Sequence, residues 1–341
     1  MMGLDLNLVW FLLVGVLFTG YVMLDGFDLG VGALHLFTKS DKERRIMLNA
    51  IGPVWDGNEV WLVTGGGALF AAFPEAYATV FSGFYTAFML LLASLIFRAV
   101  SIEVRGKQPM AWWKSAWDVG FSSSSVLSSF LIGVAMGNLA WGIPLTAGRH
   151  YAAGFWALLH PYSILMGVTA VALFMMHGAI FMLIKTEGAF QTKIREWVRN
   201  AIIFFVLCYV LVTMATLLYL PHMSALIVEY PALFLLPALN VLAIANIPRE
   251  IFHQRELRAF FSSCAAMAVL MALLGIGMFP NLVYSNPYPE LSLTIYNAAS
   301  SQKTLGIMLI IALIGMPLVL SYTVGIYWLF RGKVKLDSTS Y

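Results

Sequence analysis

Long apolar runs separated by short polar stretches make up nearly the whole chain. A helix that spans a membrane needs about 20 mostly apolar residues, and nine runs reach that length. These runs cover residues 8–37, 50–72, 78–103, 115–141, 155–184, 200–220, 225–247, 257–280 and 304–330. The pattern predicts an all-α integral membrane protein with nine transmembrane helices.

Basic residues alternate between the connections that separate these runs. The connections after the odd-numbered runs are rich in Lys and Arg, and the stretch 39–45 alone contains four of them. The connections after the even-numbered runs contain only Arg149 and Lys303. Short loops rich in Lys and Arg stay in the cytoplasm. We therefore expect the N-terminus outside and the C-terminus on the cytoplasmic side.

The composition agrees with a protein that lies in a bilayer. Hydrophobic residues make up 60% of the chain and charged residues 11%, against about one quarter charged in soluble domains. The net charge of +3 comes from several inner loops rather than from one basic patch, so nucleic-acid binding is not expected. Cys208 and Cys264 both fall in apolar runs, which argues against a disulfide framework or a zinc site.

We expect residues 1–341 to form a single polytopic membrane domain. A weak similarity between GALHLFTK, which ends the first run, and HGAIFMLIKT, which ends the fifth, suggests two four-helix halves. These halves would cover about 1–141 and 155–280, followed by the last helix at 304–330. The long outer connection 281–303 contains two Pro residues and several hydrogen-bonding side chains. It is expected to be an ordered cap, with a docking surface for a partner as the alternative.

Two pairs of acidic residues interrupt the first two apolar runs. Asp25 and Asp28 stand in LDGFDLGVG, and Asp56 and Glu59 stand in IGPVWDGNEVWLVTGGG. A carboxylate near the middle of a spanning helix costs about 2.5–3.5 kcal/mol to insert. Such residues need partners, water or a proton. Arg98, near the inner end of the third run, is a candidate counter-ion for them.

The first run carries a polar stripe that extends toward the basic connection. On a helix the stripe is about 20 Å long and comprises Tyr21, Asp25, Asp28, Gly32 and His35. One hypothesis is a hydrated lane that conducts protons from the cytoplasm, because burial brings proton exchange by a carboxyl group toward neutral pH. The other hypothesis is structural: the acids bond to backbone groups and Arg98 and lock the helices together.

Histidines and tryptophans bear on cofactor binding. Only His160 and His177 lie well inside apolar runs, and they share one helix at a separation of about 25 Å, so they do not form a bis-histidine haem site. We therefore expect no haem or metal bound directly by this chain. Trp55 and Trp61 flank the acids of the second run. They are candidates for a partner contact or for a gas or quinone passage.

Several longer motifs resemble one known family. They include LDGFDLGVG at 24–32, GPVWDGNEVWLV at 52–63, FPEAYA at 73–78, SLTIYNAASS at 292–301 and PLVLSYTVGIYWLFRGKV at 317–334. In these segments the chain resembles subunit II of the cytochrome bd-type ubiquinol oxidases. Its short loops are similar to those of the cyanide-insensitive branch.

The resemblance implies a fold and a partner. It implies two four-helix bundles plus a peripheral helix, in the bacterial inner membrane, and a heterodimer with subunit I. That subunit carries two b-type haems and one d-type haem in this family. The complex oxidises ubiquinol, reduces O2 to water and generates a proton motive force. The family is thought to have a proton path at the subunit interface. In this chain the resemblance assigns that path to Asp25 and Asp56, with Asp28 and Glu59 beside them.

Two other readings are consistent with parts of the sequence. Intramembrane acids also occur in proton-coupled secondary transporters, but the inverted repeats and interrupted helices typical of these proteins are not evident. In the second reading the chain is only a scaffold within the oxidase. The sequence leaves open whether small accessory membrane subunits attach.

Overall fold

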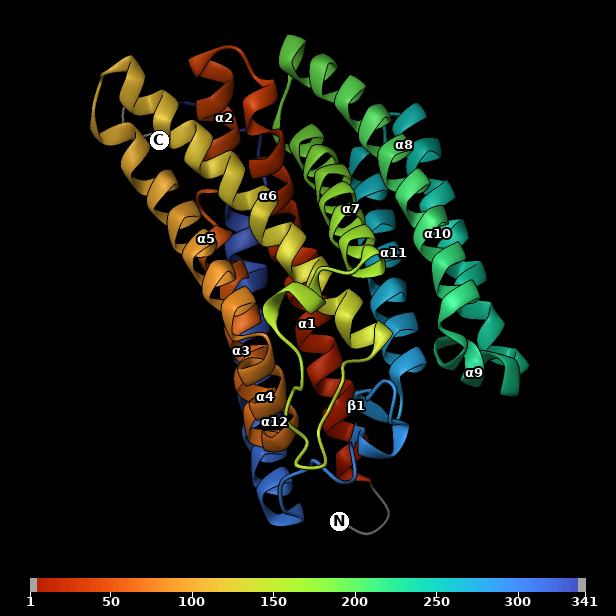
Figure 1. The fold of residues 1–341 in the computed structure, drawn as a ribbon. Coiled ribbons are helices and arrows are strands. Elements are labelled where there is room, and N and C mark those ends of the chain that lie inside the picture. The colour runs from red at the N-terminus through yellow and green to blue at the C-terminus, as the bar shows by residue number, and fades with distance from the viewer. Residues whose placement is uncertain (1–4, 337–341) are drawn as a thin grey trace.

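The computed structural model describes residues 5–336, in which long helices run side by side between the two ends of an elongated bundle (Figure 1). Eight helical segments in this part of the chain are long and apolar enough to cross a membrane. This result confirms the prediction of a helical, multi-span protein. The only sheet among the described residues is a short antiparallel pair, β1 with β2.

The helices and strands follow one another along the chain with short connections. The α-helices are α1 (Leu6–Leu34), α2 (Asp41–Ile51), α3 (Trp55–Ala72), α4 (Pro74–Gly83), α5 (Tyr85–Val104), α6 (Ala111–Trp141), α7 (Pro161–Lys185), α8 (Gly188–Tyr219), α9 (Pro221–Glu229), α10 (Leu235–Phe252), α11 (Glu256–Met278) and α12 (Gln302–Leu329). The 3-10 helices are η1 (His35–Phe37), η2 (Arg105–Lys107), η3 (Phe155–Leu158), η4 (Pro231–Phe234) and η5 (Pro289–Leu291), and the strands are β1 (Asn281–Val283) and β2 (Leu293–Thr294).

Side-chain caps fix where several helices begin. Asp5 accepts a hydrogen bond from the backbone N–H of Asn7 before α1, and Ser40 accepts one from Glu43 before α2. Ser301 does the same for Thr304 at the start of α12. Each cap satisfies a backbone N–H that has no partner within the helix.

The second predicted span, residues 50–72, differs most from the structure. A turn at 52–54 divides it, so that α2 ends at Ile51 and α3 begins at Trp55. The helix α3 is not among the eight apolar segments, because its first two turns contain Asp56, Asn58 and Glu59. It nevertheless contacts α1 and extends along the bundle (Figure 1). The predicted count of nine spans is therefore reached only if α3 also crosses the membrane.

Several other predicted helix boundaries were wrong, because a proline begins a new helical segment there. The third run begins with the separate helix α4, which starts at Pro74, and the fifth run begins with the 3-10 helix η3 and becomes α-helical only from Pro161. The seventh run is divided into α9, η4 and α10, with Pro221 and Pro231 each near the start of a helical segment. Proline lacks a backbone N–H and has a fixed φ, so it starts helices more readily than it continues them. A prediction from hydropathy alone does not include this preference of proline for the start of a helix.

The helices α1 and α7 cross at two glycines. A Cβ on Gly30 would lie 1.8 Å from the carbonyl oxygen of Phe174, and one on Gly178 would lie 2.5 Å from the backbone nitrogen of Val31. Only glycine permits this approach, as is common between membrane helices. Since α1 also contacts α3, α6, α11 and α12, it occupies the centre of the fold.

The segment 281–303 is ordered, as expected for a cap. Its residues Val283, Leu293 and Ile295 are almost fully buried, in a cluster that includes Trp10 of α1. The backbone N–H of Ser300 donates to the carbonyl of Ala72 at 2.8 Å. This segment therefore ties the end of α3 to the beginning of α12.

We predict that Gly30→Ala destabilises the protein, because the new methyl group meets backbone atoms that cannot rotate away. Overpacking of this kind costs about 1–3 kcal/mol, measurable as a lower midpoint of thermal unfolding in detergent. The matched control is Gly15→Ala on the same helix, where a Cβ meets no atom of residues 5–336 within 4 Å. Equal midpoints for the two variants would contradict the close crossing.

Candidate functional site

A buried guanidinium joins three of the first helices. Arg98 of α5 donates from Nη2 to Asp25 Oδ1 of α1 at 2.6 Å and to Glu59 Oε2 of α3 at 3.2 Å. The side chains of Arg98 and Asp25 are fully buried, and that of Glu59 is 22% exposed. We call these three residues the Arg98 cluster. The sequence-based prediction that Arg98 is the counter-ion of the intramembrane acids is confirmed for Asp25 and Glu59.

Asp28 lies one helical turn from Asp25 and has different partners. The amide of Asn58 in α3 donates to Asp28 Oδ2 at 2.7 Å and to the carbonyl of Leu24 at 3.2 Å. The hydroxyl of Tyr327 in α12 donates to Asn58 Oδ1 at 2.9 Å. Neither Asn58 nor Tyr327 was predicted from the sequence as part of the site. For Asn58 there was a signal, because it stands between Asp56 and Glu59 in the same motif.

Several buried polar atoms near the Arg98 cluster and Asp28 have no hydrogen-bond partner among residues 5–336. They are Asp25 Oδ2, Asp28 Oδ1, Tyr21 Oη, and Nε and Nη1 of Arg98. Buried polar atoms nearly always have a hydrogen-bond partner, from the protein or from ordered water. Asp25 Oδ2 and Asp28 Oδ1 are therefore buried acceptors that receive no hydrogen bond from residues 5–336.

Asp56 does not join the other three acids. It is exposed, whereas Asn58 is buried and Glu59 is half-buried. The buried face of α3 is formed by Trp55, Asn58 and Trp61, and Asp56 lies about 100° away from Trp55 around the helix. The predicted convergence of four acids is therefore corrected to three, with Asp56 on the outer surface of α3.

The two candidate tryptophans both lie in the core. Trp55 and Trp61 are each 9% exposed. Trp61 packs against α1 at Gly20, where a Cβ would lie 2.4 Å from Trp61 Cε3. A role for them in a gas or quinone passage stays a prediction.

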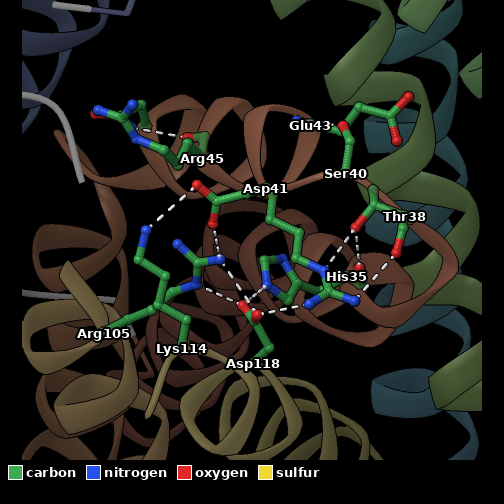
Figure 2. A network of polar contacts seen from close by, with 11 residues as sticks. His35, Thr38, Ser40, Asp41, Glu43, Arg45, Arg105, Lys114 and Asp118 are labelled. Carbon is green, nitrogen blue, oxygen red and sulfur yellow. Dashed lines mark hydrogen bonds and ion pairs between the residues drawn. The ribbon is translucent and has the colours of Figure 1, made fainter. Parts of the chain in front are cut away.

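His35 belongs to a second cluster, at the end of α1 (Figure 2). Its Nε2 lies 2.6 Å from Asp118 Oδ1 in α6. Arg105 donates to both oxygens of Asp118, at 2.5 and 3.2 Å, and also to Asp41 Oδ1 at 2.7 Å. Arg44 donates to Asp118 Oδ2 at 2.7 Å. We call these five residues the Asp118 cluster.

The Asp118 cluster is an ion-pair network that connects four parts of the chain. Asp41, in the first turn of α2, is half-exposed. Burial raises the pKa of its carboxyl group, but the hydrogen bond and charge of Arg105 and the charge of Lys114 outweigh that effect and lower the pKa. Asp41 therefore stays ionised, and the cluster favours the structural reading for His35. The predicted stripe from Tyr21 to His35 thus divides into two separate sites.

His177 is held by hydrogen bonds on both ring nitrogens. Its Nδ1 lies 2.7 Å from the hydroxyl of Ser263, and its Nε2 lies 2.9 Å from the carbonyl oxygen of Met23. The ring also stacks on Phe260 at 4.8 Å. Both ring nitrogens of His177 are therefore occupied by partners within the chain. Residues 5–336 contain no group of three or more His, Cys, Asp or Glu placed to hold a metal ion.

The fold and site define a polytopic helical membrane protein with ionisable groups buried among its first helices. A family model described as cytochrome bd terminal oxidase subunit II matches residues 6–330. The chain belongs to this family.

Relatives of similar length support the assignment. Cytochrome bd-I ubiquinol oxidase subunit 2 of Escherichia coli (strain K12) is 36% identical, over 96% of this chain and 95% of that protein. Cytochrome bd ubiquinol oxidase subunit 2 of Bacillus subtilis (strain 168) is 35% identical, over 97% of each. The structure of bd oxidase from Geobacillus thermodenitrificans contains a chain with the same fold, at a TM-score of 0.78 and 17% identity, covering 96% of this chain and 98% of that one.

We predict that Asp118→Asn destabilises the protein by about 3–5 kcal/mol, because it removes the buried negative charge that pairs with Arg44 and Arg105. Thermal unfolding of the purified protein in detergent measures the effect. Glu187→Gln is the control, since Glu187 is exposed and makes no side-chain cap to α8. A midpoint for Asp118→Asn as high as that of the control would show that the network contributes little.

Proposed function

We propose that this chain is the non-haem subunit II of a bd-type quinol oxidase in the bacterial inner membrane. In this proposal it binds a haem-bearing subunit I and helps to bring cytoplasmic protons to it. Family membership and the names of the relatives support the assignment to the complex. The observation that carries the proton role is the Arg98 cluster, with an unpaired buried carboxylate oxygen on Asp25.

Three of the six histidines of this chain have ring nitrogens bonded within it. Both ring nitrogens of His177 are bonded within the chain, and Nε2 of His35 is bonded to Asp118. Nε2 of His222 lies 2.9 Å from the carbonyl oxygen of Ala140. In this proposal two b-type haems and one d-type haem reside in subunit I, as the family membership implies. There they would carry electrons from ubiquinol to O2.

The exposed face of α3 is the proposed contact with subunit I. Asp56 is exposed there beside the partly exposed Glu59, and Val60 and Val63 are 52% and 71% exposed on the same helix. An ionised carboxylate that faces lipid is costly, so a protein partner on this face is favoured. Asp56 would then stand at the interface, with the Arg98 cluster directly behind it.

This arrangement gives each acid a distinct role in proton transfer. Arg98 bonds Oδ1 of Asp25 and leaves Oδ2 unpaired, so Oδ2 is the atom that accepts a proton. Glu59 touches the same guanidinium from the partly exposed side and connects Asp25 with the surface at Asp56. Arg98 keeps its charge throughout, which holds the acids in place without itself exchanging protons.

We also propose the predicted topology of nine spans with the C-terminus in the cytoplasm. The helix α3 follows α2 at one end of the bundle and, through Ala72, meets the cap 281–303 at the other. Since α3 connects both ends, it acts as the ninth span despite its polar first turns. The proposed halves, 1–141 and 155–280, then meet at the crossing of α1 and α7, with α12 on the periphery.

We predict that Asp56→Asn and Asp25→Asn each lower oxygen consumption by the purified complex about tenfold or more, a typical contribution of a proton-transferring group. Haem content, measured from the absorbance of the same sample, is expected to stay unchanged for Asp56→Asn, because this side chain is exposed. Asp25→Glu keeps a carboxyl group beside Arg98 and is expected to restore part of the activity.

Glu75→Gln is the matched control, because Glu75 pairs with Arg149 at an exposed position in α4, which follows the other end of α3 from Asp56. Unchanged oxygen consumption in both Asp variants with intact haem content would refute the proton role and leave a scaffold. Purification without a partner that has b- and d-type haem absorbance would instead refute the assignment to the oxidase and favour a transporter.

A further inference from the structure

We propose that a basic pocket at the C-terminal ends of α7 and α12 binds the phosphate headgroup of an anionic phospholipid. The pocket has a volume of about 360 Å³ and lies between the end of α2, the end of α7, the end of α12 and residues 330–335. Such a volume is within the range of small-molecule sites. It is separate from the Arg98 and Asp118 clusters, whose residues do not line it.

The charge of the lining favours an anion. Lys185, Lys333 and Lys335 line the pocket, and none of its described lining residues is Asp or Glu. Asn49 and Tyr327 add further polar groups. Three ammonium groups around one cavity repel one another unless a negative charge lies between them.

Two of the three lysines, Lys185 and Lys333, are held in place by backbone contacts. Lys185 Nζ donates to the carbonyl of Phe330, and Lys333 Nζ donates to the carbonyl of Leu183 at 3.2 Å. The backbone N–H of Val334 donates to the carbonyl of Lys185 at 2.9 Å. An ammonium group has three donors, so each of these lysines retains donors for a bound phosphate.

The position in the bundle favours a lipid over a free phosphate ion. Lys185 is the last residue of α7 and Leu329 the last of α12, and both helices are candidate membrane spans. Helix ends of this kind lie at the level of the lipid headgroups. The lining also includes apolar residues such as Val54 and Phe181, which suit the glycerol and first acyl carbons. Basic pockets between helices on the cytoplasmic side are typical sites for anionic lipids.

A lipid in this pocket would stabilise the least buried of the eight candidate membrane spans in residues 5–336. Only 6% of the apolar stretch of α12 is buried. Its Tyr327 lines the pocket and also donates to Asn58, which in turn donates to Asp28. A bound headgroup would hold the end of α12, and with it this hydrogen-bonded chain, in the observed position.

The experiment titrates the delipidated, purified oxidase complex with dioleoyl phosphatidylglycerol and counts bound lipid by native mass spectrometry. The variant K185Q/K333Q/K335Q is expected to bind about tenfold more weakly or worse and to lose one tightly bound lipid. The control K39Q/K42Q/K107Q removes the same charge from exposed positions in the basic loops and is expected to bind like the wild type. Unchanged haem content and helix content in all samples exclude a folding defect.

Further arms separate the possible sources of the anion. K185R/K333R/K335R keeps the charge and is expected to retain the lipid. Phosphatidylcholine is expected to bind the wild type and all variants equally. Equal phosphatidylglycerol binding by both glutamine variants would overturn the proposal. Displacement of the lipid by inorganic phosphate at millimolar concentration would also overturn it, in favour of a free anion. These outcomes do not depend on oxygen consumption, so they are independent of the proton role.

Discussion

The structure depends on one buried charge, the guanidinium of Arg98, which must be paired because it lies away from water. Arg98 is fully buried among α1, α3 and α5, and its guanidinium is within hydrogen-bond distance of Asp25 and Glu59. In a low-dielectric interior an isolated charge is very costly, and removal of one partner leaves the other uncompensated. The three helices must therefore meet at one depth and in one rotation, and this requirement fixes the first half of the fold around α1.

Close helix packing makes this arrangement possible. At Gly30 and Gly178 the backbones of α1 and α7 approach too closely for any side chain, so the polar face of α1 is turned toward α3 and α5. The Asp118 cluster fixes the other end of α1 by joining it to α2, α5 and α6. Between these constraints the polar atoms of α1 have little freedom, and the unpaired oxygens of Asp25 and Asp28 remain the points where a proton or water fits.

The acids of this chain thus have different functions despite their similar sequence context. Asp118 and Asp41 are surrounded by cationic side chains and serve as structural acceptors. Asp25 and Glu59 share one guanidinium and lie next to the exposed Asp56. In the proposed function, a carboxylate with several cationic partners is structural and one with an unpaired oxygen accepts a proton, because a fully paired carboxylate gains little from a proton.

The sequence by itself determined the class of protein, the approximate spans, the acidic pairs and Arg98 as their counter-ion. Apolar run length and charge depend only on local composition, and a spanning helix satisfies its backbone within itself. Only the tertiary structure decided that Asp56 faces outward, that His35 pairs with Asp118, and that Asn58 and Tyr327 complete the site of Asp28. Helical periodicity determines which residues share a face. The side chains that cover that face come from distant segments, as Tyr327 does for Asn58, 269 residues earlier in the chain. Contacts of that kind have no local signature in the chain.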